Sequence, residues 1–331
     1  MNSGFVLQRV SARDPDFPAL RAGVAALKDI LEGRISTDAE LLLELARFQA
    51  EDGSFRLTDS WEMPADARVD FGYYPTYLAA AIFMREYLRP EPRISPKTVE
   101  EVLARALQAS LGRELRGHGY EAERGTIEAL DAFRQGGLRE FLERSPALAP
   151  RFQAAVWNIL DEREAVLQKE GVYQGAWGAD HTEEWRRLLG EIRPRRRKYA
   201  AYGSNMYAGQ MKERCPGAKL LGPTYLPDFN LKFYRTATIG PRRGAKTPAV
   251  IWEIGQDDEV SLDRWEGYPK SYRKRSFVVT LQDAECAVMA YVMTEERKER
   301  DAGVKPRESY LDLIRQGYRD AGFTEEPFPA G

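Results

Sequence analysis

Glu266 stands in the segment VSLDRWEGYPKSYRKRSF, where its carboxylate falls at the end of a predicted helix. Gly267 follows it directly, and a glycine at this position commonly ends a helix. A carboxylate there lies near the negative end of the helix macrodipole, which disfavours its ionised form. The flanking aromatic residues, Trp265, Tyr268 and Tyr272, would also remove water from it and raise its pKa. This setting suits a general acid/base working near neutral pH, whereas a solvent-exposed helix-end glutamate is the alternative interpretation.

Tyr202-Gly203-Ser204-Asn205 is the second stretch that can do chemistry, and the strand-like run KYAAY leads into it. Successive backbone N–H groups beside a glycine can bind a carboxylate or a phosphate as a backbone nest. The Ser204 hydroxyl would add one more hydrogen-bond donor. An ordinary turn between a strand and a loop is the alternative, and this stretch alone does not decide between the two.

Other candidate side chains receive structural interpretations. Asp263 is expected to cap or orient its own helix. Cys215 and Cys286 form neither a metal cluster nor a disulfide framework, so we expect them to pack as small hydrophobic residues in a reducing compartment. The basic run RRRK at 195–198 is expected to be part of a solvated linker rather than a phosphate site.

Helical periodicity dominates the chain before this basic run. The segment TDAELLLELARFQ begins with two capping residues and places Leu41, Leu45 and Phe48 on one helical face. The segment SPKTVEEVLARALQASLGREL repeats the pattern after a Ser-Pro start. Residues 1–192 are therefore predicted to form an all-α domain of unknown role.

The character of the sequence changes after residue 192. Residues 193–198 are predicted to be a basic linker, because proline and four basic residues occur together there. Short β-prone runs then follow, separated by turn-forming residues: KYAAY, NLKFYRTATI, PAVIWEI, RKRSFVVTL and CAVMAYVM. Two helical segments interrupt them, DEVSLDRWEG and PRESYLDLIRQGYRDAGF. Residues 199–331 are therefore predicted to form an α+β domain with a small barrel-like sheet.

Several motifs of this second region occur in order, among them KYAAYGSNM, FNLKFYRTATI, LDRWEGYPKSY and PRESYLDLIRQGYRDAGF. Together they resemble the γ-glutamylcyclotransferase-like (AIG2-like) family over about residues 197–324. The resemblance implies a small mixed β-barrel with helices and neither a metal nor an organic cofactor. It assigns the acid/base role to Glu266 and a substrate contact to Tyr310. The loop that would hold the glutamyl group through backbone N–H groups comprises Tyr199, Ala200, Ala201, Tyr202, Gly203, Ser204 and Asn205.

The resemblance implies a small-molecule substrate whose free α-amine attacks its own γ-glutamyl amide carbonyl. The products would be 5-oxoproline and the released amine or amino acid. One alternative is a regulatory or scaffolding protein, in which the helical region binds a partner and the second region senses a γ-glutamyl ligand without turnover. Another keeps the reaction but takes a γ-glutamylated biosynthetic intermediate or protein side chain, delivered by the helical domain.

The segment LARFQAEDGSFRL carries a second resemblance, in the helical region. It is similar to the Gln-x-x-x-Gly-x-aromatic element of terpenoid-cyclase-type α/α-toroids, over about residues 40–90. No regular repeat period is visible, and the acidic catalytic cluster of the cyclases is not evident, so we expect no cyclase activity. The helical domain is instead a candidate for contacts with a protein partner or within an oligomer.

Bulk composition argues against two classes of partner. The 331 residues include 49 basic and 51 acidic ones, for a formal net charge of −2, which gives no overall attraction to nucleic acid or an anionic membrane. The start of the chain, MNSGFVLQRVSARDPDF, lacks the pattern of a secretory signal. No window approaches 18 uninterrupted apolar residues. We therefore expect a soluble, cytoplasmic protein that binds neither nucleic acid nor membrane.

Overall fold

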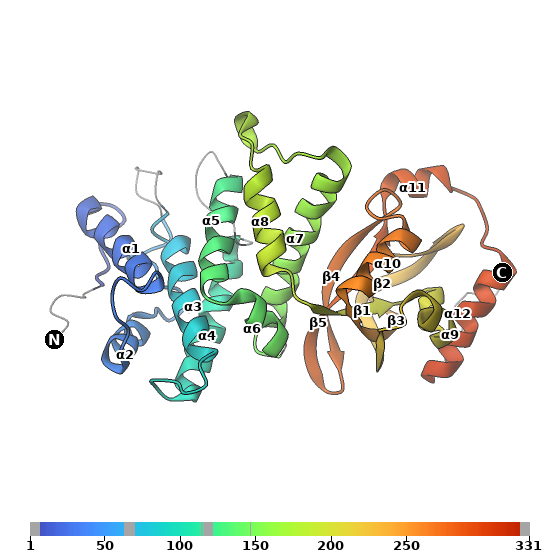
Figure 1. The fold of residues 1–331 in the computed structure, drawn as a ribbon, viewed down its shortest axis with the longest axis horizontal. Helices are drawn as coiled ribbons and strands as arrows, with labels where there is room; N and C mark the ends of the chain where they lie inside the picture. The colour runs from blue at the N-terminus through green and yellow to red at the C-terminus, as the bar shows by residue number, and fades with distance from the viewer. Residues whose placement is uncertain (1–6, 63–69, 114, 116–121, 146, 325–331) are drawn as a thin grey trace. The chain divides into compact units, whose positions relative to one another are not determined.

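The chain forms two compact units in a computed structural model, which describes residues 7–62, 70–113, 115, 122–145 and 147–324 (Figure 1). The helical unit comprises residues 1–155 and 172–193, and the α/β unit comprises residues 156–171 and 194–331. The predicted fold class, an all-α region followed by an α+β region, is confirmed.

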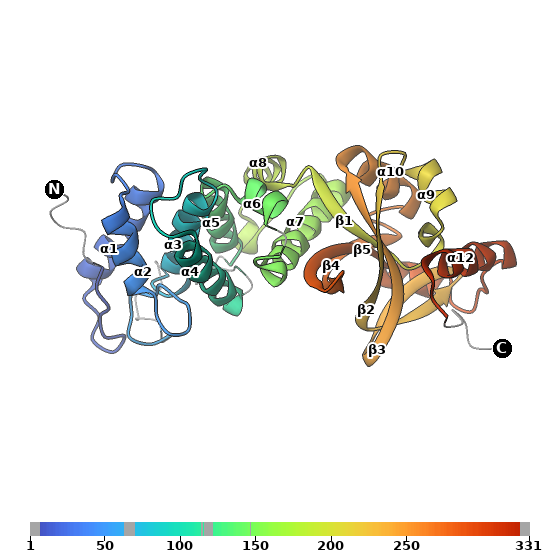
Figure 2. The ribbon, with the colours of Figure 1, turned by 90° about the horizontal axis from the view of Figure 1, so that it is seen from below.

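Helix α3 lies at the centre of the helical unit. It contacts α1, α4 and α5, and every residue from Pro75 to Met84 is buried, because the run PTYLAAAIFM is apolar on nearly all its faces (Figure 2). The helices that precede the first strand are α1 (Phe17–Leu31), α2 (Ala39–Phe48), α3 (Tyr73–Tyr87), α4 (Pro96–Ser110), α5 (Ala122–Gln135), α6 (Leu138–Arg144), α7 (Pro150–Glu170) and α8 (Thr182–Ile192), with the 3-10 helices η1 (Leu111–Arg113) and η2 (Ala176–Gly178).

The Gln-x-x-x-Gly-x-aromatic element forms a turn that fixes the end of α2 against α4. The Gln49 amide donates to the carbonyls of Gly53, at 3.0 Å, and of Val102 on α4, at 2.9 Å. Gly53 has a φ of +86°, and a Cβ there would lie 2.5 Å from the Arg105 carbonyl oxygen, so only glycine fits. Phe55 is fully buried. The element therefore has a packing role here, and the resemblance to a toroid stays a prediction, with residues 63–69 of that stretch outside the described residues.

The α/β unit contains a five-stranded mixed sheet in the order β2-β3-β1-β5-β4. Strands β1 and β5 are parallel, and the other neighbouring strands are antiparallel. The strands are β1 (Arg196–Ala201), β2 (Lys219–Tyr234), β3 (Thr236–Gly255), β4 (Tyr272–Leu281) and β5 (Ala284–Met293). Its helices, besides most of α7, are the short 3-10 helix η3 (Ser204–Met206), α9 (Ala208–Arg214), α10 (Gln256–Glu266), α11 (Glu295–Arg300) and α12 (Glu308–Ala321).

The sheet curves so that its two outer strands approach each other. The Thr224 hydroxyl on β2 donates to the Thr280 carbonyl on β4 at 2.6 Å. Strand β2 accommodates the curvature with register shifts after Leu220 and Pro227, since bulges bend and twist a strand. This arrangement agrees with the mixed, barrel-like sheet predicted for the second region.

The β-prone run NLKFYRTATI is a hairpin corner rather than one strand. Strand β2 ends at Tyr234 and β3 begins at Thr236, with Arg235 between them at a φ of +64°. Residues that commonly mark such corners are glycine, asparagine and aspartate, because they tolerate the left-handed conformation. An arginine in this position gives no such signal in the sequence.

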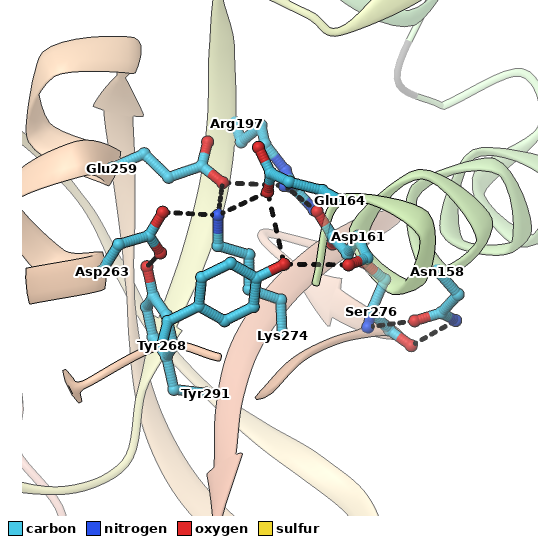
Figure 3. A network of polar contacts seen from close by, with 10 residues as sticks. All are labelled: Asn158, Asp161, Glu164, Arg197, Glu259, Asp263, Tyr268, Lys274, Ser276 and Tyr291. Atoms are coloured by element: carbon cyan, nitrogen blue, oxygen red, sulfur yellow. Dashed lines mark hydrogen bonds and ion pairs between the residues drawn. The ribbon is translucent and has the colours of Figure 1, made fainter. Parts of the chain in front are cut away.

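The basic run at 195–198 is not a solvated linker. Arg196 begins β1, and the Arg197 side chain is only 3% exposed. The Arg197 guanidinium donates to both carboxylate oxygens of Asp161 on α7, at 2.8 and 2.7 Å, and to Glu259 on α10, at 2.9 Å (Figure 3). Burial lowers the pKa of Arg197, but these two carboxylates outweigh it and raise the pKa above its ordinary value. Arg197 is thus a buried structural cation.

Lys274 on β4 is the second cation of this buried network, and its side chain is fully enclosed. The Lys274 ammonium is covered by the Tyr268 ring, whose centroid lies 4.3 Å away. Three carboxylates surround it: Glu259 at 2.8 Å, Asp263 at 2.9 Å and Glu164 at 3.3 Å (Figure 3). The network therefore ties α7 and α10 to strands β1 and β4.

Most of helix α7 belongs to the α/β unit. The Asn158 side chain donates to the backbone carbonyl of Ser276 on β4, at 3.3 Å, and accepts from its N–H, at 2.7 Å (Figure 3). The predicted boundaries, with a domain 1–192 and a linker 193–198, place all of α7 in the helical domain. The contacts instead group residues 156–171 with the sheet.

Gly317 allows helix α12 to pack closely on η3. A Cβ at this position would lie 2.6 Å from the Met206 Cβ and 2.9 Å from the Tyr207 backbone nitrogen. Glycine is required here by the close approach of two backbone segments rather than by its own dihedral angles. The position of Tyr310, two turns earlier on α12, depends on this contact.

Gly317→Val should lower the free energy of unfolding by about 1–3 kcal/mol, because α12 has to move away from η3 to make room for the side chain. Chemical denaturation monitored by circular dichroism measures the change. Gly190→Ala on α8 is the control, since a Cβ there meets nothing within 4 Å and alanine favours a helix. Equal stability of the Gly317→Val variant and the wild type would contradict the close contact.

Candidate active site

A cavity of about 250 Å³ opens in the α/β unit where α10, α12 and η3 meet the sheet. Its walls combine aromatic rings with a small number of charged groups. The lining residues are Tyr199, Tyr202, Gly203, Ser204, Asn205, Arg214, Thr236, Ala237, Arg264, Trp265, Glu266, Gly267, Ser271, Tyr272, Tyr291, Arg297 and Tyr310.

Glu266 is the last residue of α10 and faces this cavity. Gly267 ends the helix in the left-handed conformation, with a φ of +63°. Burial raises the pKa of Glu266 to about 7, and the Arg214 charge and the hydrogen bond from Asn205 moderate the increase. The carboxylate therefore changes its protonation state close to neutral pH, as a general acid/base requires.

The Asn205 side chain is held in one orientation by its neighbours. Its carbonyl oxygen accepts from the Gln210 amide and from the Arg214 guanidinium, both at 2.9 Å. Its amide nitrogen must then point the other way, where it donates to Glu266 at 3.1 Å and to the Tyr199 hydroxyl at 3.0 Å. The two donors on the oxygen fix the assignment of the amide. Asn205 thus positions the Glu266 carboxylate.

The turn between β1 and α9 presents backbone donors to the cavity. Gly203, Ser204 and Asn205 all line it, and within the described part of the chain their N–H groups have no acceptor. A Cβ on Gly203 would lie 3.3 Å from the Tyr310 hydroxyl, so the backbone approaches that side chain closely. Consecutive free N–H groups at a bend of this kind can bind an anion.

Tyr310 reaches the cavity from α12. Its hydroxyl accepts from the Ala237 N–H at 3.0 Å, and Ser204 also bonds to it. Burial raises the pKa of Tyr310 to about 12, so the hydroxyl stays protonated at neutral pH. Ser204 in turn accepts from the Gln210 amide at 2.6 Å. Tyr310, Ser204 and Gln210 therefore form one chain of hydrogen bonds beside the backbone donors.

The arrangement of these residues agrees with a comparison between this sequence and known protein families. Residues 199–312 match the model of the family described as Gamma-glutamyl cyclotransferase, AIG2-like. This region is AIG2-like. The predicted resemblance to that family is confirmed for the second region.

Solved structures similar to this chain were also found. One is named Gamma-glutamyl cyclotransferase, with 24% identity, 39% of this chain and 82% of that chain covered, and a TM-score of 0.34. An uncharacterized protein from Homo sapiens has 25% identity, the same coverages of 39% and 82%, and a TM-score of 0.35. YkqA from Bacillus subtilis has 18% identity, coverages of 38% and 48%, and a TM-score of 0.33. No curated protein matches the chain. The assignment of residues 199–312 to the AIG2-like family therefore rests on the family match and not on these structures.

Most of the predicted site residues meet in this AIG2-like cavity. Tyr310 and Glu266, from distant parts of the sequence, reach it together with five residues of the predicted loop: Tyr199, Tyr202, Gly203, Ser204 and Asn205. The other two, Ala200 and Ala201, are fully buried in β1 and pair with β3. They are not among the described lining residues, and their substrate contact stays a prediction.

The AIG2-like cavity also contains residues that the sequence analysis did not select. Tyr291 on β5 lines it and donates to Asp263 at 2.6 Å, which links the cavity to the buried network (Figure 3). Burial raises the pKa of Asp263, against the effects of Lys274 and Tyr291. A role of this carboxylate in capping or orienting α10 stays a prediction. The charged lining residues that were missed are Arg214, Arg264 and Arg297.

Three further observations concern metal binding, membrane insertion and the two cysteines. Among the described residues, no three histidine, cysteine or acidic side chains are grouped as metal ligands would be. Nor does any helix in the described part of the chain have the length and apolar character that crossing a bilayer requires. Cys215 and Cys286 are both buried.

Proposed function

We propose that the AIG2-like region cleaves a γ-glutamyl amide by intramolecular attack and releases 5-oxoproline together with an amine or amino acid. The observation that carries the proposal is the position of Glu266. Its carboxylate, with a pKa of about 7, faces a cavity that Gly203, Ser204 and Asn205 also line, and the backbone N–H groups of these three residues, which have no acceptor among the described residues, are free to donate. A proton acceptor and an anion-binding turn are the two elements that this cyclisation needs.

The first step is deprotonation of the substrate amine. At neutral pH the α-amine is mostly an ammonium and cannot attack, so ionised Glu266 takes one of its protons. The N–H groups of the turn hold the α-carboxylate and fold the glutamyl chain back on itself. The amine nitrogen then forms a bond to the γ-carbonyl carbon, and because the two groups belong to one molecule, holding them together supplies much of the rate.

The second step is expulsion of the leaving amine. As the bond forms, negative charge develops on the γ-carbonyl oxygen, and an N–H group of the turn can stabilise it. Glu266 returns its proton to the leaving nitrogen, and the original carbon–nitrogen bond breaks. The ring nitrogen loses its second proton, which the released amine takes up, so the products are the five-membered lactam 5-oxoproline and the ammonium form of the amine, with Glu266 ionised again for the next cycle.

The full chain should release 5-oxoproline from at least one γ-glutamyl amino acid or γ-glutamyl amine. Liquid chromatography with mass spectrometry detects this product directly. If a panel of such compounds gives no 5-oxoproline, the proposed activity is wrong. Tight binding of the same compounds without turnover would favour the sensing alternative instead.

The rate should fall in acid with the titration of Glu266. Since only the ionised form accepts a proton, kcat/KM should decrease about tenfold per pH unit below a midpoint near 7. Burial produces this midpoint, so an ordinary exposed glutamate would give one near 4.5. Initial rates between pH 5 and 9 measure it, and a profile that is flat down to pH 5 would contradict the role of Glu266.

Asn205→Ala should move this acidic limb to higher pH by about one unit, because the ionised carboxylate loses a hydrogen bond that favours it. A purely structural role for Asn205 would lower the rate without moving the midpoint. The pH dependence of kcat/KM separates the two outcomes. Asn230→Ala on β2 is the matched control, and its midpoint should stay with that of the wild type.

A further inference from the structure

Another cavity, of about 250 Å³, opens in the helical unit and shares no lining residue with the AIG2-like cavity. Helices α1, α3, α5 and α8 line it, and each of them packs on the next in this order (Figure 1). Leu31, Leu78 and Ile127 are buried at its floor, whereas Arg124 and Glu128 are exposed at its mouth. This helical cavity therefore combines an apolar floor with a charged mouth.

Two ion pairs join α5 to α8 beside the helical cavity. Arg124 on α5 pairs with Glu184 on α8 at 2.7 Å. Arg187 on α8 pairs with Asp131 on α5 at 3.0 Å. The charges of these four lining residues therefore already have counterparts, and the pairs hold one wall of the cavity in place.

Lys28 and Glu128 also line the helical cavity, and neither has a close ionic partner among the described residues. The half-buried Lys28 side chain lies across the Tyr74 ring, with its ammonium 5.0 Å from the ring centroid, and no described carboxylate is within ion-pair distance of it. The nearest cation to Glu128 is Arg124, at 3.7 Å, which is already bound to Glu184. One ammonium and one carboxylate at the cavity can therefore still pair with a ligand.

Two neutral groups beside these charges can also form further hydrogen bonds. Burial, together with the charges of Glu128 and Asp131, raises the pKa of Tyr74, so its hydroxyl is protonated at neutral pH, and no acceptor in the described part of the chain binds it. The Gln135 amide nitrogen donates to Asp131 at 3.0 Å, while its oxygen has no donor within the same residues. The helical cavity thus offers one hydroxyl donor and one amide acceptor.

A simple ion does not fit this set of charges. Four of the described lining residues are acidic and three are basic, so an anion on Lys28 would lie in surroundings of net negative charge. Glu32, one of the four acidic residues, is occupied by an ion pair with Arg34. A cation on Glu128 would leave the half-buried Lys28 ammonium without a partner. A molecule that carries both charges and an apolar part satisfies Lys28, Glu128 and the floor together.

We propose that the helical cavity binds one free amino acid with an apolar side chain, its carboxylate on Lys28 and its ammonium on Glu128. Lys28 lies over the Tyr74 ring, and Glu128 is close enough for its charge to act on the Tyr74 hydroxyl, so one small molecule reaches both. Pockets for drug-sized ligands have volumes of about 300–1,000 Å³, so this smaller cavity suits a single amino acid better than a peptide. The inference goes beyond the proposed function and does not depend on it.

Calorimetric titration of the full chain with L-leucine tests this directly. One molecule should bind per chain. Isocaproate is leucine without the ammonium, and isoamylamine is leucine without the carboxylate. Each should bind about tenfold or more weakly than L-leucine, since each loses a hydrogen-bonded contact with a charged group, which is worth at least this factor.

Two substitutions locate the binding site. Lys28→Met and Glu128→Gln keep the sizes of the side chains but remove their charges, and each should weaken L-leucine binding about tenfold. The matched controls are Lys97→Met and Glu100→Gln, at exposed positions on α4 outside the described lining residues, and they should bind L-leucine like the wild type.

The outcomes separate this inference from the proposed function. If L-leucine, L-methionine and L-phenylalanine all fail to bind at millimolar concentrations, the amino-acid site is wrong. Binding that neither Lys28→Met nor Glu128→Gln weakens would place the amino acid elsewhere and overturn the site, and isocaproate binding as tightly as L-leucine would overturn the role of Glu128. Release of 5-oxoproline is a separate measurement, so its absence would refute the proposed function and leave the helical cavity unaffected.

Discussion

Glu266→Gln should reduce 5-oxoproline release by about a hundredfold to ten-thousandfold, the range typical of losing a general acid/base. Glutamine keeps the size and shape of the side chain but cannot take the proton from the substrate ammonium. Substrate binding should be largely retained, because the donors on residues 203–205 are unchanged. Single-turnover rates and calorimetric binding, measured on the same variant, show whether the loss lies in the chemical step.

The control for this variant is Glu285→Gln, an exposed carboxylate on β5 of the same unit. Its rate should equal that of the wild type. The stability of the protein gives a second check. The folded state raises the pKa of Glu266 to about 7, so the protonated side chain stabilises the fold at low pH, and this stabilisation is lost as pH rises through 7. Glu266→Gln should therefore melt at a higher temperature than the wild type at pH 8 but not at pH 4. Retention of most activity would remove Glu266 from the mechanism.

Lys274→Met should be the most destabilising of the substitutions considered, with a loss of about 3–5 kcal/mol in the free energy of unfolding. The ammonium is fully enclosed and lies between three carboxylates, on Glu164, Glu259 and Asp263. Methionine fills a similar volume but leaves these negative charges facing one another without the cation. Urea denaturation at neutral pH measures the loss.

Lys246→Met is the matched control, since Lys246 is exposed on β3, and its unfolding free energy should change little. The loss for Lys274→Met should shrink in acid, because protonation of the surrounding carboxylates removes their repulsion. A loss below about 1 kcal/mol at neutral pH would show that the network does not hold α10 in place. Because Asp263 also accepts from Tyr291, which lines the cavity, the variant should lose activity as well.

Local signals in the sequence were enough to predict several elements. Helix α2 begins where expected, with the Asp38 side chain accepting from the Leu41 N–H at 2.8 Å. The apolar runs around Tyr199 and Val288 are strands β1 and β5. Glu266 could be selected as well, because a glycine after it and aromatic neighbours are local features. Its role as a general acid/base stays a prediction, although the structure does place it at the end of a helix in a buried position, as the sequence indicated.

What the sequence could not predict depends on contacts between distant residues. Arg197 reads as a linker residue, since its carboxylate partners lie 36 and 62 positions away. Arg214 and Arg297 reach the cavity from helices whose placement no local pattern specifies. Arg235 turns the chain in the left-handed conformation, which arginine rarely adopts, so its residue type does not predict the turn. In each case tertiary packing overrides the local preference, which is why periodicity and composition miss it.

Helix α7 has a consequence for how the protein is made. Glu164 precedes its ion-pair partner Lys274 by 110 residues, so the ribosome must synthesise that stretch before the pair can form. At typical rates of translation this takes roughly 5 to 20 seconds. During this interval the helix is present while the strand that carries Lys274 does not yet exist. The α/β unit therefore cannot fold in the order of synthesis and closes only when its last strands emerge.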